Sequence, residues 1–404
     1  MPDRRTAHGD LLLGPEQGRA RGLPDRDSDA CGVAVIEQRR VHYIDWLRVL
    51  AVLLLFPFHV SRVFNAGDPF YVKSPYVSSA LGAVLSFISV WHMPLLFLLA
   101  GASSYFALRK RTVGKYAIER VKRLLLPFIF GFLVLIPPQT WIGGRFNSGY
   151  AGSFLHYLTS TDFLVFNIRD GGDYYGGFGI GHLWFVLWLF MISMVALPLL
   201  AWGRGERGQA ALARFARVLA HPLGWLVAAF ILAVGEALPD PVRINPFYYM
   251  AFFVLGYAIM FDGSVIETAE RIRWPALITG FAVAAWFALT WRWRDSLPDP
   301  SAERAAITIV ANLGCWLVLL GMLGLGKRHL DKPGPALAYL APASYPLYII
   351  HQTVIVLAAY VIVDLAIPGS VQWLLLFVVA VTGTFAVYEA VRRVPWLRKG
   401  FGLR

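Results

Sequence analysis

Long apolar stretches alternate with short polar segments along most of this chain. Between residues 41 and 391, runs of roughly 18 to 25 mostly apolar residues recur, and each ends at a charged or Pro/Gly-rich loop. A helix of about 20 residues crosses the hydrocarbon core of a bilayer. The pattern predicts an all-α, polytopic membrane protein with about ten transmembrane helices, near residues 42–62, 77–107, 124–142, 182–202, 222–238, 246–261, 274–291, 306–326, 336–363 and 371–391.

Lysine and arginine gather in every second segment between these helices. One set carries 21 of them and the alternate set carries 8. Because positively charged loops stay in the cytoplasm, we expect both termini to be cytoplasmic and the protein to be a multi-pass component of the inner (plasma) membrane. The loop 143–181 is then the largest extracytoplasmic segment. The basic set comprises residues 108–123, 203–217, 262–273, 327–334 and 392–404.

The same pattern divides the chain into three regions. Residues 1–40 are polar, and their apolar runs are too short for the core of a signal peptide, so we expect a disordered cytoplasmic tail. Residues 41–391 form the predicted ten-helix membrane domain. Residues 392–404 form a basic cytoplasmic tail.

Composition supports the membrane class and excludes others. Hydrophobic residues make up 57% of the chain and charged residues 15%, whereas soluble domains carry about a quarter charged residues. The formal net charge of +12 follows alternate loops, so no nucleic-acid partner is expected. The two cysteines, Cys31 and Cys315, lie in the polar tail and in an apolar stretch, which disfavours a disulfide framework. The P-loop, GxSxG, CxxC and HExxH motifs are absent.

The first predicted helix contains ionisable residues that are costly at membrane depth. Arg48 and His59 are eleven residues apart, so they share one face of a helix, roughly 16 Å apart along its axis. Asp45 is positioned to pair with Arg48. His59, near the outer end, is the candidate general base for a hydroxyl group arriving from outside. The structural alternative is that both side chains only reach toward the membrane interfaces.

Two arginines precede the third apolar stretch, in the sequence ERVKRLLLPF. Arg120 and Arg123 are three residues apart and would share a helix face at the inner membrane surface. Guanidinium groups match phosphate oxygens, so this pair is the candidate binding site for a nucleotide-bearing donor. Simple positive-inside anchoring is the alternative.

Further candidates lie in later apolar stretches. His182 and Trp184 begin the fourth, Tyr348 and His351 lie in the ninth, and His92 lies in the second. Buried histidines suit a binding cavity, whereas His182 also suits an interfacial position and His92 a hydrogen bond to a neighbouring helix. We expect no metal, because no local ligand spacing supports a site built from these histidines and His59.

The ordered motifs resemble those of the membrane-bound acyltransferase 3 family, which includes polysaccharide O-acetylases and periplasmic glucan succinyltransferases. IDWLRVLAVLLLFPFH is similar to the family's first helix, WHMPLLFLLAG to its second with Ala100 in place of a serine, and ERVKR to its R-x-x-R motif. GHLWFV and ASYPLYIIH resemble two later segments. The resemblance implies acyl transfer across the membrane from acyl-coenzyme A, with His59, Arg48, Arg120 and Arg123 in functional positions.

We therefore expect an integral membrane O-acyltransferase that moves an acetyl, succinyl or similar group from cytosolic acyl-CoA to a hydroxyl of an extracytoplasmic glycan. His59 is the expected base, and Arg48, steadied by Asp45, holds the donor or the developing oxyanion. No permanently bound cofactor is expected. The expected partners are lipid, acyl-CoA and the acceptor, with the oligomeric state open and a homodimer among the choices. The alternatives are a secondary transporter or flippase and a scaffold subunit.

Overall fold

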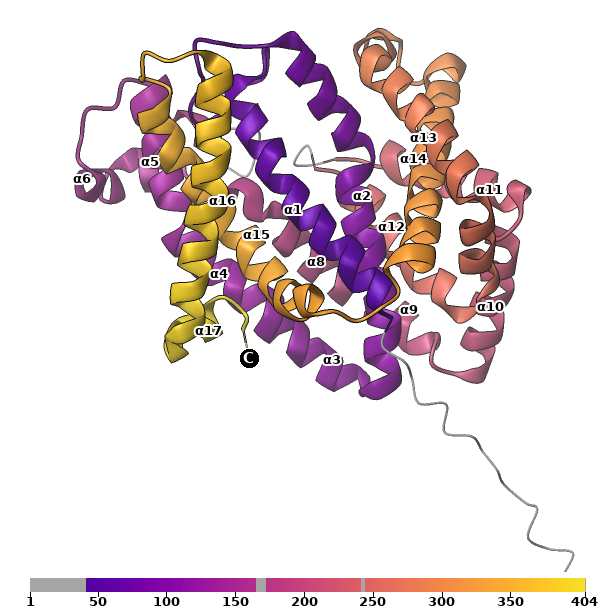
Figure 1. Ribbon diagram of the computed structural model, residues 1–404. Coiled ribbons are helices and arrows are strands. Elements are labelled where there is room, and N and C mark those ends of the chain that lie inside the picture. The colour runs from indigo at the N-terminus through magenta and orange to yellow at the C-terminus, as the bar shows by residue number, and fades with distance from the viewer. Residues whose placement is uncertain (1–40, 165–171, 241–243, 404) are drawn as a thin grey trace, which may run out of the picture. The chain divides into compact units, whose positions relative to one another are not determined.

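The computed structural model describes residues 41–164, 172–240 and 244–403 (Figure 1). Within these ranges the secondary structure is helical, apart from one isolated parallel bridge between Asn65 and Ser78. The all-α expectation is confirmed for this part of the chain. The predicted disordered tail, residues 1–40, lies outside it.

The helices follow one another with short connections. Those that matter for the site are α1 (His42–Phe64), α2 (Ser79–Lys110), α3 (Val113–Arg120), the π-helix η1 (Val121–Leu125), η3 (Gly181–Leu183) and α8 (Trp184–Val195). The later ones are α11 (Pro222–Ala237), α12 (Pro246–Ala258), α13 (Ser264–Ser296), α14 (Ala302–Leu325), α15 (Pro335–Ile362) and α16 (Gly369–Arg393). The remaining elements are α4 (Leu126–Val134), α5 (Ile136–Asn147), α6 (Phe154–Leu158), α7 (Thr161–Leu164), η2 (Gly172–Tyr175), α9 (Leu197–Trp202), α10 (Glu206–Leu219), η4 (Ile259–Phe261), η5 (Gly326–Leu330) and α17 (Pro395–Gly400).

Each predicted apolar stretch coincides with helical structure, but the helices are not equally long. In the described residues, seven segments are long and apolar enough to cross a membrane. The pair α10 and α11 meets that test only together and is bent by 107°, while Gly181–Val195 and Pro246–Phe261 are shorter apolar helices. The chain is therefore a multi-pass membrane protein, and ten spans remain a prediction.

The basic segments lie at one end of the helices. Figure 1 shows α3, α10 and α17 at its lower end. There the backbone N–H of His42 donates to Asp331 Oδ1 at 3.0 Å, which joins the start of α1 to the basic segment 327–334. At the opposite end, Ser74 Oγ donates to Gln372 Oε1 at 3.1 Å. The alternating charge pattern predicts that the basic segments share an end. The side of the membrane on which this end lies stays a prediction.

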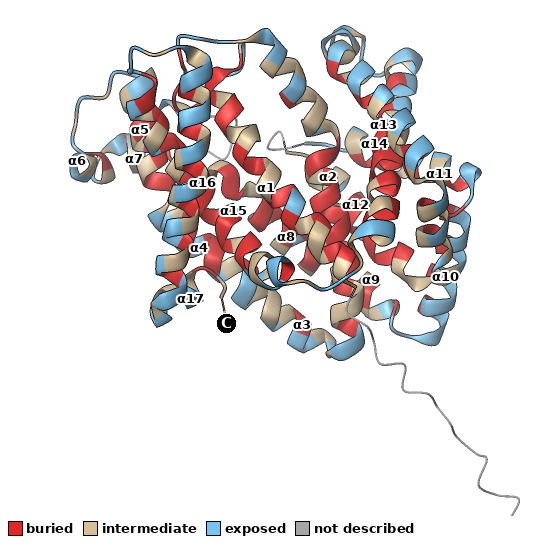
Figure 2. Ribbon diagram, viewed as in Figure 1, coloured by how far each residue is buried: buried red, intermediate tan, exposed pale blue. Residues whose placement is uncertain are grey.

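Burial is concentrated in four central helices. In the apolar windows of α1 and α2, 56% of residues are buried inside the protein, and the windows that include α14 and α15 reach 67%. The corresponding values for α13 and α16 are 22% and 28%. Figure 2 shows the same contrast between the red interior of α1, α2 and α15 and the pale blue of α16. Apolar side chains on α13 and α16 therefore face the surroundings, as expected for lipid-facing helices.

Glycines bring α2 and α12 into backbone contact. A Cβ atom built on Gly101 would lie 1.9 Å from the carbonyl oxygen of Phe253, and one on Gly256 would lie 2.0 Å from that of Leu98. Small residues are the usual means of close helix packing in membranes. Gly101 belongs to the LLAG motif, so this motif holds α2, which carries Ser103 and Ser104, against α12.

Candidate active site

Helix α1 carries two functional candidates at opposite ends. It runs without interruption from His42 to Phe64, although Pro57 lies inside it. The separation of eleven positions between Arg48 and His59 corresponds to a rise of roughly 16 Å. The two side chains therefore belong to separate parts of the site and cannot both touch one small reacting group.

Arg48 lies at the basic end and is held by two neighbours. Its Nη1 donates to Asp45 Oδ1 at 3.0 Å, which is the expected pair. Its Nη2 donates to Ser103 Oγ of α2 at 2.6 Å, a contact that the sequence did not indicate. About a third of the Arg48 side chain is exposed, at 33%. The guanidinium is thus oriented by two helices while part of it stays accessible.

Arg120 is held by the next residue of α2. Its Nη2 donates to Ser104 Oγ at 2.9 Å, and its guanidinium lies 4.6 Å from the centre of the Tyr116 ring. The Tyr116 hydroxyl also donates to Ser104 Oγ, at 3.0 Å. Consecutive serines of α2 therefore bind Arg48 from α1 and Arg120 from α3. The structure brings these two candidates to the same region of the fold.

Arg123 differs from Arg120 in its surroundings. The α-helix gives way at Val121 to the π-helical turn η1, in which hydrogen bonds join residues five apart and each turn contains more residues than in an α-helix. The prediction that Arg120 and Arg123 share a helix face assumed the α-helical period. That period ends immediately after Arg120. Arg120 is partly buried, whereas Arg123 is exposed. A sequence pattern of two basic residues three apart does not reveal such a turn.

Three histidines from three distant segments form a cluster at the other end of α1. The ring centre of His59 lies 5.0 Å from that of His351 on α15. The ring centre of His351 lies 5.3 Å from that of His182 on η3. His182 and His351 are buried, at 5% and 1% exposure, and His59 is partly buried. His351 thus adjoins the candidate base, and His182 adjoins His351 in turn.

Hydrogen bonds to carbonyl groups define the tautomers of two of these histidines. His182 Nε2 donates to the carbonyl of Ile349 at 2.9 Å, and His351 Nδ1 donates to that of Tyr348 at 2.6 Å. Because a carbonyl only accepts, these nitrogens carry hydrogen in the neutral rings. His182 Nδ1 and His351 Nε2 are then acceptors. Both are buried without a partner, as is His59 Nδ1.

His92 has a different role. It is buried, with 2% exposure, and its Nε2 donates to the Ala51 carbonyl of α1 at 2.7 Å. Its ring centre is 6.1 Å from that of Phe58. Of the two expectations for this residue, the hydrogen bond to a neighbouring helix is the one observed. This hydrogen bond joins α2 to α1 at Ala51, which lies between Arg48 and His59 along the helix.

The GHLW segment contains a turn at Gly181 that leads the chain toward the histidine cluster. Gly181 has a φ of +48°, in the left-handed region that favours glycine, and an added Cβ would lie 2.8 Å from Ile136 Cδ1. The turn directs His182 into the cluster, where its carbonyl accepts a hydrogen bond from the Tyr348 hydroxyl. Two residues later, Trp184 packs against Tyr249 with ring centres 5.3 Å apart. Tyr348 therefore has a defined partner in the cluster.

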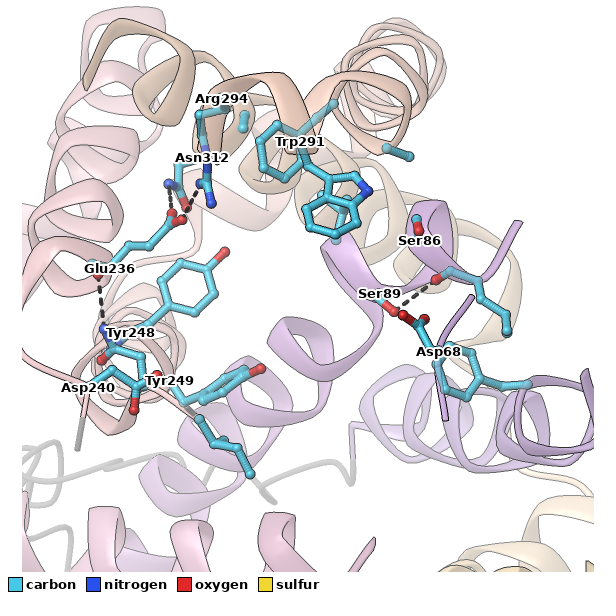
Figure 3. Close-up of a pocket in the computed structure, with 18 of the residues that line it drawn as sticks. Asp68, Ser86, Ser89, Glu236, Asp240, Tyr248, Tyr249, Trp291, Arg294 and Asn312 are labelled. Atoms are coloured by element: carbon cyan, nitrogen blue, oxygen red, sulfur yellow. Dashed lines mark hydrogen bonds and ion pairs between the residues drawn. The ribbon is translucent and has the colours of Figure 1, made fainter. Parts of the chain in front are cut away.

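A cavity of about 570 Å³ lies beside the cluster, between α1, α2 and the helices α11 to α14. Phe58 lines it, and the ring centre of Phe58 is 5.2 Å from that of His59. Figure 3 shows Glu236, Arg294 and Asn312 on one wall and Ser86, Ser89 and Asp68 on the other. Sequence reasoning missed this site. Its available signal was Glu236, an ionisable residue inside the predicted stretch 222–238.

Two loops are joined at the same end as the cluster. The Tyr71 hydroxyl donates to the buried carboxyl of Asp173, and Asn147 Nδ2 donates to the Tyr174 carbonyl at 2.7 Å. Burial raises the pKa of Asp173 to about 6. Nearby, Lys73 Nζ donates to the Arg62 carbonyl at 2.9 Å, and burial lowers the pKa of Lys73 to about 8. These contacts restrain the segments on either side of the cluster.

In the part of the chain that the structure describes, no group of three or more His, Cys, Asp or Glu side chains is arranged to hold a metal ion. The three unpartnered ring nitrogens of the histidine cluster, those of His59, His182 and His351, are groups that exchange protons.

Comparison with known proteins agrees with these elements. Residues 41–389 match the family model described as an acyltransferase domain, of the acyltransferase 3 type. The chain is 24% identical to "Glucans biosynthesis protein C" of Escherichia coli (strain SMS-3-5 / SECEC) over 386 residues, covering 90% of this chain and 94% of that protein. It is 22% identical to the protein of the same name from Salmonella agona (strain SL483), covering 89% and 94%. No solved structure matches the chain significantly.

Proposed function

Because the chain belongs to the membrane-bound acyltransferase 3 family, and is therefore an acyltransferase of groups other than amino-acyl groups, we propose that it transfers an acyl group from acyl-CoA to a sugar hydroxyl on the far side of the membrane. The acceptor class is proposed because the similar proteins of Escherichia coli and Salmonella carry the name "Glucans biosynthesis protein C". Acetyl and succinyl are the candidate groups.

The observation that carries the proposal is the histidine cluster. His59 is partly accessible, beside the cavity, and its buried Nδ1 lies in a cluster where His351 Nε2 also lacks a partner. Because the ring centres are 5.0 Å apart, the proposal includes a rotation of the His59 ring that brings its Nδ1–H to donate to His351 Nε2. That bond would leave His59 Nε2 as the basic nitrogen, since one nitrogen of a neutral ring is always an acceptor.

In the proposed reaction, His59 takes the proton of the acceptor hydroxyl as the oxygen attacks the thioester carbonyl. The carbon–sulfur bond breaks, the electron pair leaves on sulfur, and the imidazolium returns its proton to the thiolate. The products are an ester and a free thiol. His351 acts as a positioning residue, and no covalent acyl-enzyme is needed.

The donor is proposed to enter at the basic end. Arg48 and Arg120 offer guanidinium groups that suit phosphate oxygens. Since Arg48 lies roughly 16 Å along α1 from His59, its proposed role is to hold the donor, and not to contact the oxyanion. The long arm of coenzyme A then extends along α1 toward the cluster. Arg123, exposed beside them, is proposed to add a further phosphate contact.

Transfer from one face to the other requires the basic end to be cytoplasmic. The proposal therefore includes cytoplasmic termini, ten membrane crossings and an inner-membrane location. The proposed three crossings beyond the seven long ones are the two short apolar helices, Gly181–Val195 and Pro246–Phe261, and α11 of the bent α10–α11 pair.

The proposal is tested with purified protein in sealed vesicles, labelled acetyl-CoA or succinyl-CoA, and a glucan acceptor. The expected product is an ester on the glucan, detected by mass spectrometry, only when donor and basic end share a compartment. Transport of unmodified glucan without ester formation would identify a transporter instead.

A further inference from the structure

The cavity beside Phe58 has a chemistry of its own. Its volume of about 570 Å³ lies within the usual range for small-molecule sites, roughly 300–1,000 Å³. Its walls combine flat aromatic rings with hydroxyl, amide and charged groups. The aromatic residues are Phe58, Trp184, Tyr248, Tyr249, Phe287 and Trp291.

One polar wall is built around Glu236. Its Oε1 accepts from Arg294 Nη1 at 2.6 Å, and its Oε2 accepts from Asn312 Nδ2 at 2.8 Å. The Oδ1 atom of Asn312 is buried without a partner. Arg294 is also fixed by Asp295 at 2.7 Å. Three helices, α11, α13 and α14, therefore hold a rigid set of donors and acceptors.

The charges of the lining are largely compensated. Arg294 pairs with Glu236, and Arg62 pairs with Asp68 at 3.1 Å. With Asp240, the lining contains three carboxylates and two guanidiniums. An anionic ligand would meet a slight excess of negative charge. An uncharged ligand with many hydroxyls would use these groups as hydrogen-bond partners without disturbing either pair.

Trp291 gives the cavity a flat apolar surface. Figure 3 shows its indole projecting between the Glu236–Arg294–Asn312 wall and the Ser86–Ser89 wall. The C–H face of a pyranose ring packs flat on such a surface while its hydroxyls reach the polar walls at the ring edge. Rings with polar edges and apolar faces are the ligands that match both features.

We infer that this cavity is a subsite for a neutral saccharide, which seats the acceptor so that one hydroxyl passes Phe58 to reach His59. The inference rests on the proposed acyl transfer, because it assigns the acceptor of that reaction. Phe58 supports the connection, since it lines the cavity and its ring centre is 5.2 Å from that of His59. Trp184 lines it too, two residues after His182 of the cluster.

The test uses the full chain in lipid nanodiscs free of maltoside detergents, whose sugar headgroups would compete. Binding of a neutral gluco-oligosaccharide is measured without donor, and hydrolysis of acyl-CoA by water is measured without acceptor. Trp291→Ala and Glu236→Gln should each raise the Kd for the sugar on the order of tenfold and leave donor hydrolysis unchanged. Trp291→Ala keeps the Glu236 network intact, so it remains informative if Glu236→Gln folds poorly.

Matched controls come from the same helices. Trp293→Ala on α13 removes an exposed tryptophan outside the cavity, and Glu303→Gln on α14 removes an exposed carboxylate. Both should bind sugar normally. An anionic oligosaccharide of equal length should bind more weakly. Binding of an alkyl glucoside embedded in the bilayer, compared with binding of the free oligosaccharide, distinguishes a glycolipid headgroup from a free glycan.

The outcomes separate the two proposals. Unchanged sugar affinity in both cavity variants, or preference for the anionic oligosaccharide, would overturn the subsite. Sugar binding that is lost in the variants, in a protein that never forms an ester, would support the subsite and contradict the acyl transfer. Ester formation on another acceptor without sugar binding would do the reverse.

Discussion

At the scale of single residues, the site depends on which ring nitrogen carries hydrogen. The carbonyls of Ile349 and Tyr348 hold the hydrogens of His182 and His351 on defined atoms. Their other nitrogens face a buried space without partners. A buried polar atom without a partner is costly. In the proposed reaction, the unpartnered Nε2 of His351 is the acceptor that orients His59.

Replacing His59 with glutamine should abolish transfer. Glutamine keeps a polar side chain of similar reach but cannot accept the proton, so the rate should fall on the order of 10²- to 10⁴-fold. The measurement is ester formation at saturating donor. His221→Gln, at an exposed histidine, is the control and should retain full activity. Near-normal turnover in His59→Gln would reduce this residue to an interfacial anchor.

Replacing Arg120 with lysine should weaken donor binding more than turnover. Lysine keeps the charge but loses the planar group that stacks on Tyr116 and donates to Ser104. The donor KM should rise on the order of tenfold, since hydrogen bonds to charged groups contribute about 1.5–3 kcal/mol. Arg109→Lys, exposed and stacked on Tyr105, should show little change. Equal effects in both variants would favour simple anchoring by charge.

At the scale of elements, function depends on helices held at close range. The π-helical turn after Arg120, the left-handed turn at Gly181 and the glycine contacts of α2 with α12 each set the direction of a functional side chain. None of them takes part in chemistry. Each would be detected by its effect on folding or on side-chain position.

Gly101→Ala should destabilise the protein strongly. Its Cβ would lie 1.9 Å from the Phe253 carbonyl oxygen, so α2 and α12 must separate, at a cost of about 1–3 kcal/mol or more. A lower melting temperature by tryptophan fluorescence is the expected result. Gly114→Ala on α3 has nothing within 4 Å of the new atom and should be tolerated. If both variants melt alike, the close contact is not what holds these helices.

The burial of the Asp173 carboxyl beside Tyr71 should make stability depend on pH. Burial raises the pKa of Asp173 from 3.8 to about 6, so the folded protein binds this proton more tightly than the unfolded chain does. The resulting stabilisation is present below pH 4 and is lost as the pH rises through about 6, on the order of 3 kcal/mol. Asp173→Asn should remove this dependence from the melting curves.

Asp364→Asn, at an exposed carboxylate near the same end, is the control and should keep the pH dependence of the unaltered protein. The same slope in Asp173→Asn would show that other groups cause it.

At the scale of the whole molecule, the basic end and the end with the cavity should lie on opposite sides of the membrane. A cysteine at Ser148, which is exposed at the cavity end, should react with an impermeant reagent in intact cells. A cysteine at Gln209, exposed in α10 at the basic end, should react only after permeabilisation. The reverse pattern would invert the proposed direction of transfer. Cys31→Ser provides a suitable background, since Cys315 is buried.

The amino-acid sequence by itself determined the helical class, the membrane location of the helices and the two sets of loops. Each of these features depends on the hydropathy or charge of about 20 consecutive residues, so it can be read directly from the sequence. It also indicated Arg48, His59, His182 and His351, because ionisable residues are rare in apolar stretches.

Only the tertiary structure decided which of these residues meet. His59, His182 and His351 come together from three segments more than a hundred residues apart, whereas His92 binds a backbone carbonyl. Glu236, Arg294 and Asn312 form one wall for the same reason. Such contacts depend on how helices pack, which no local spacing encodes. The π-helical turn after Arg120 is a further case, because it is a departure from the regular period that sequence patterns assume.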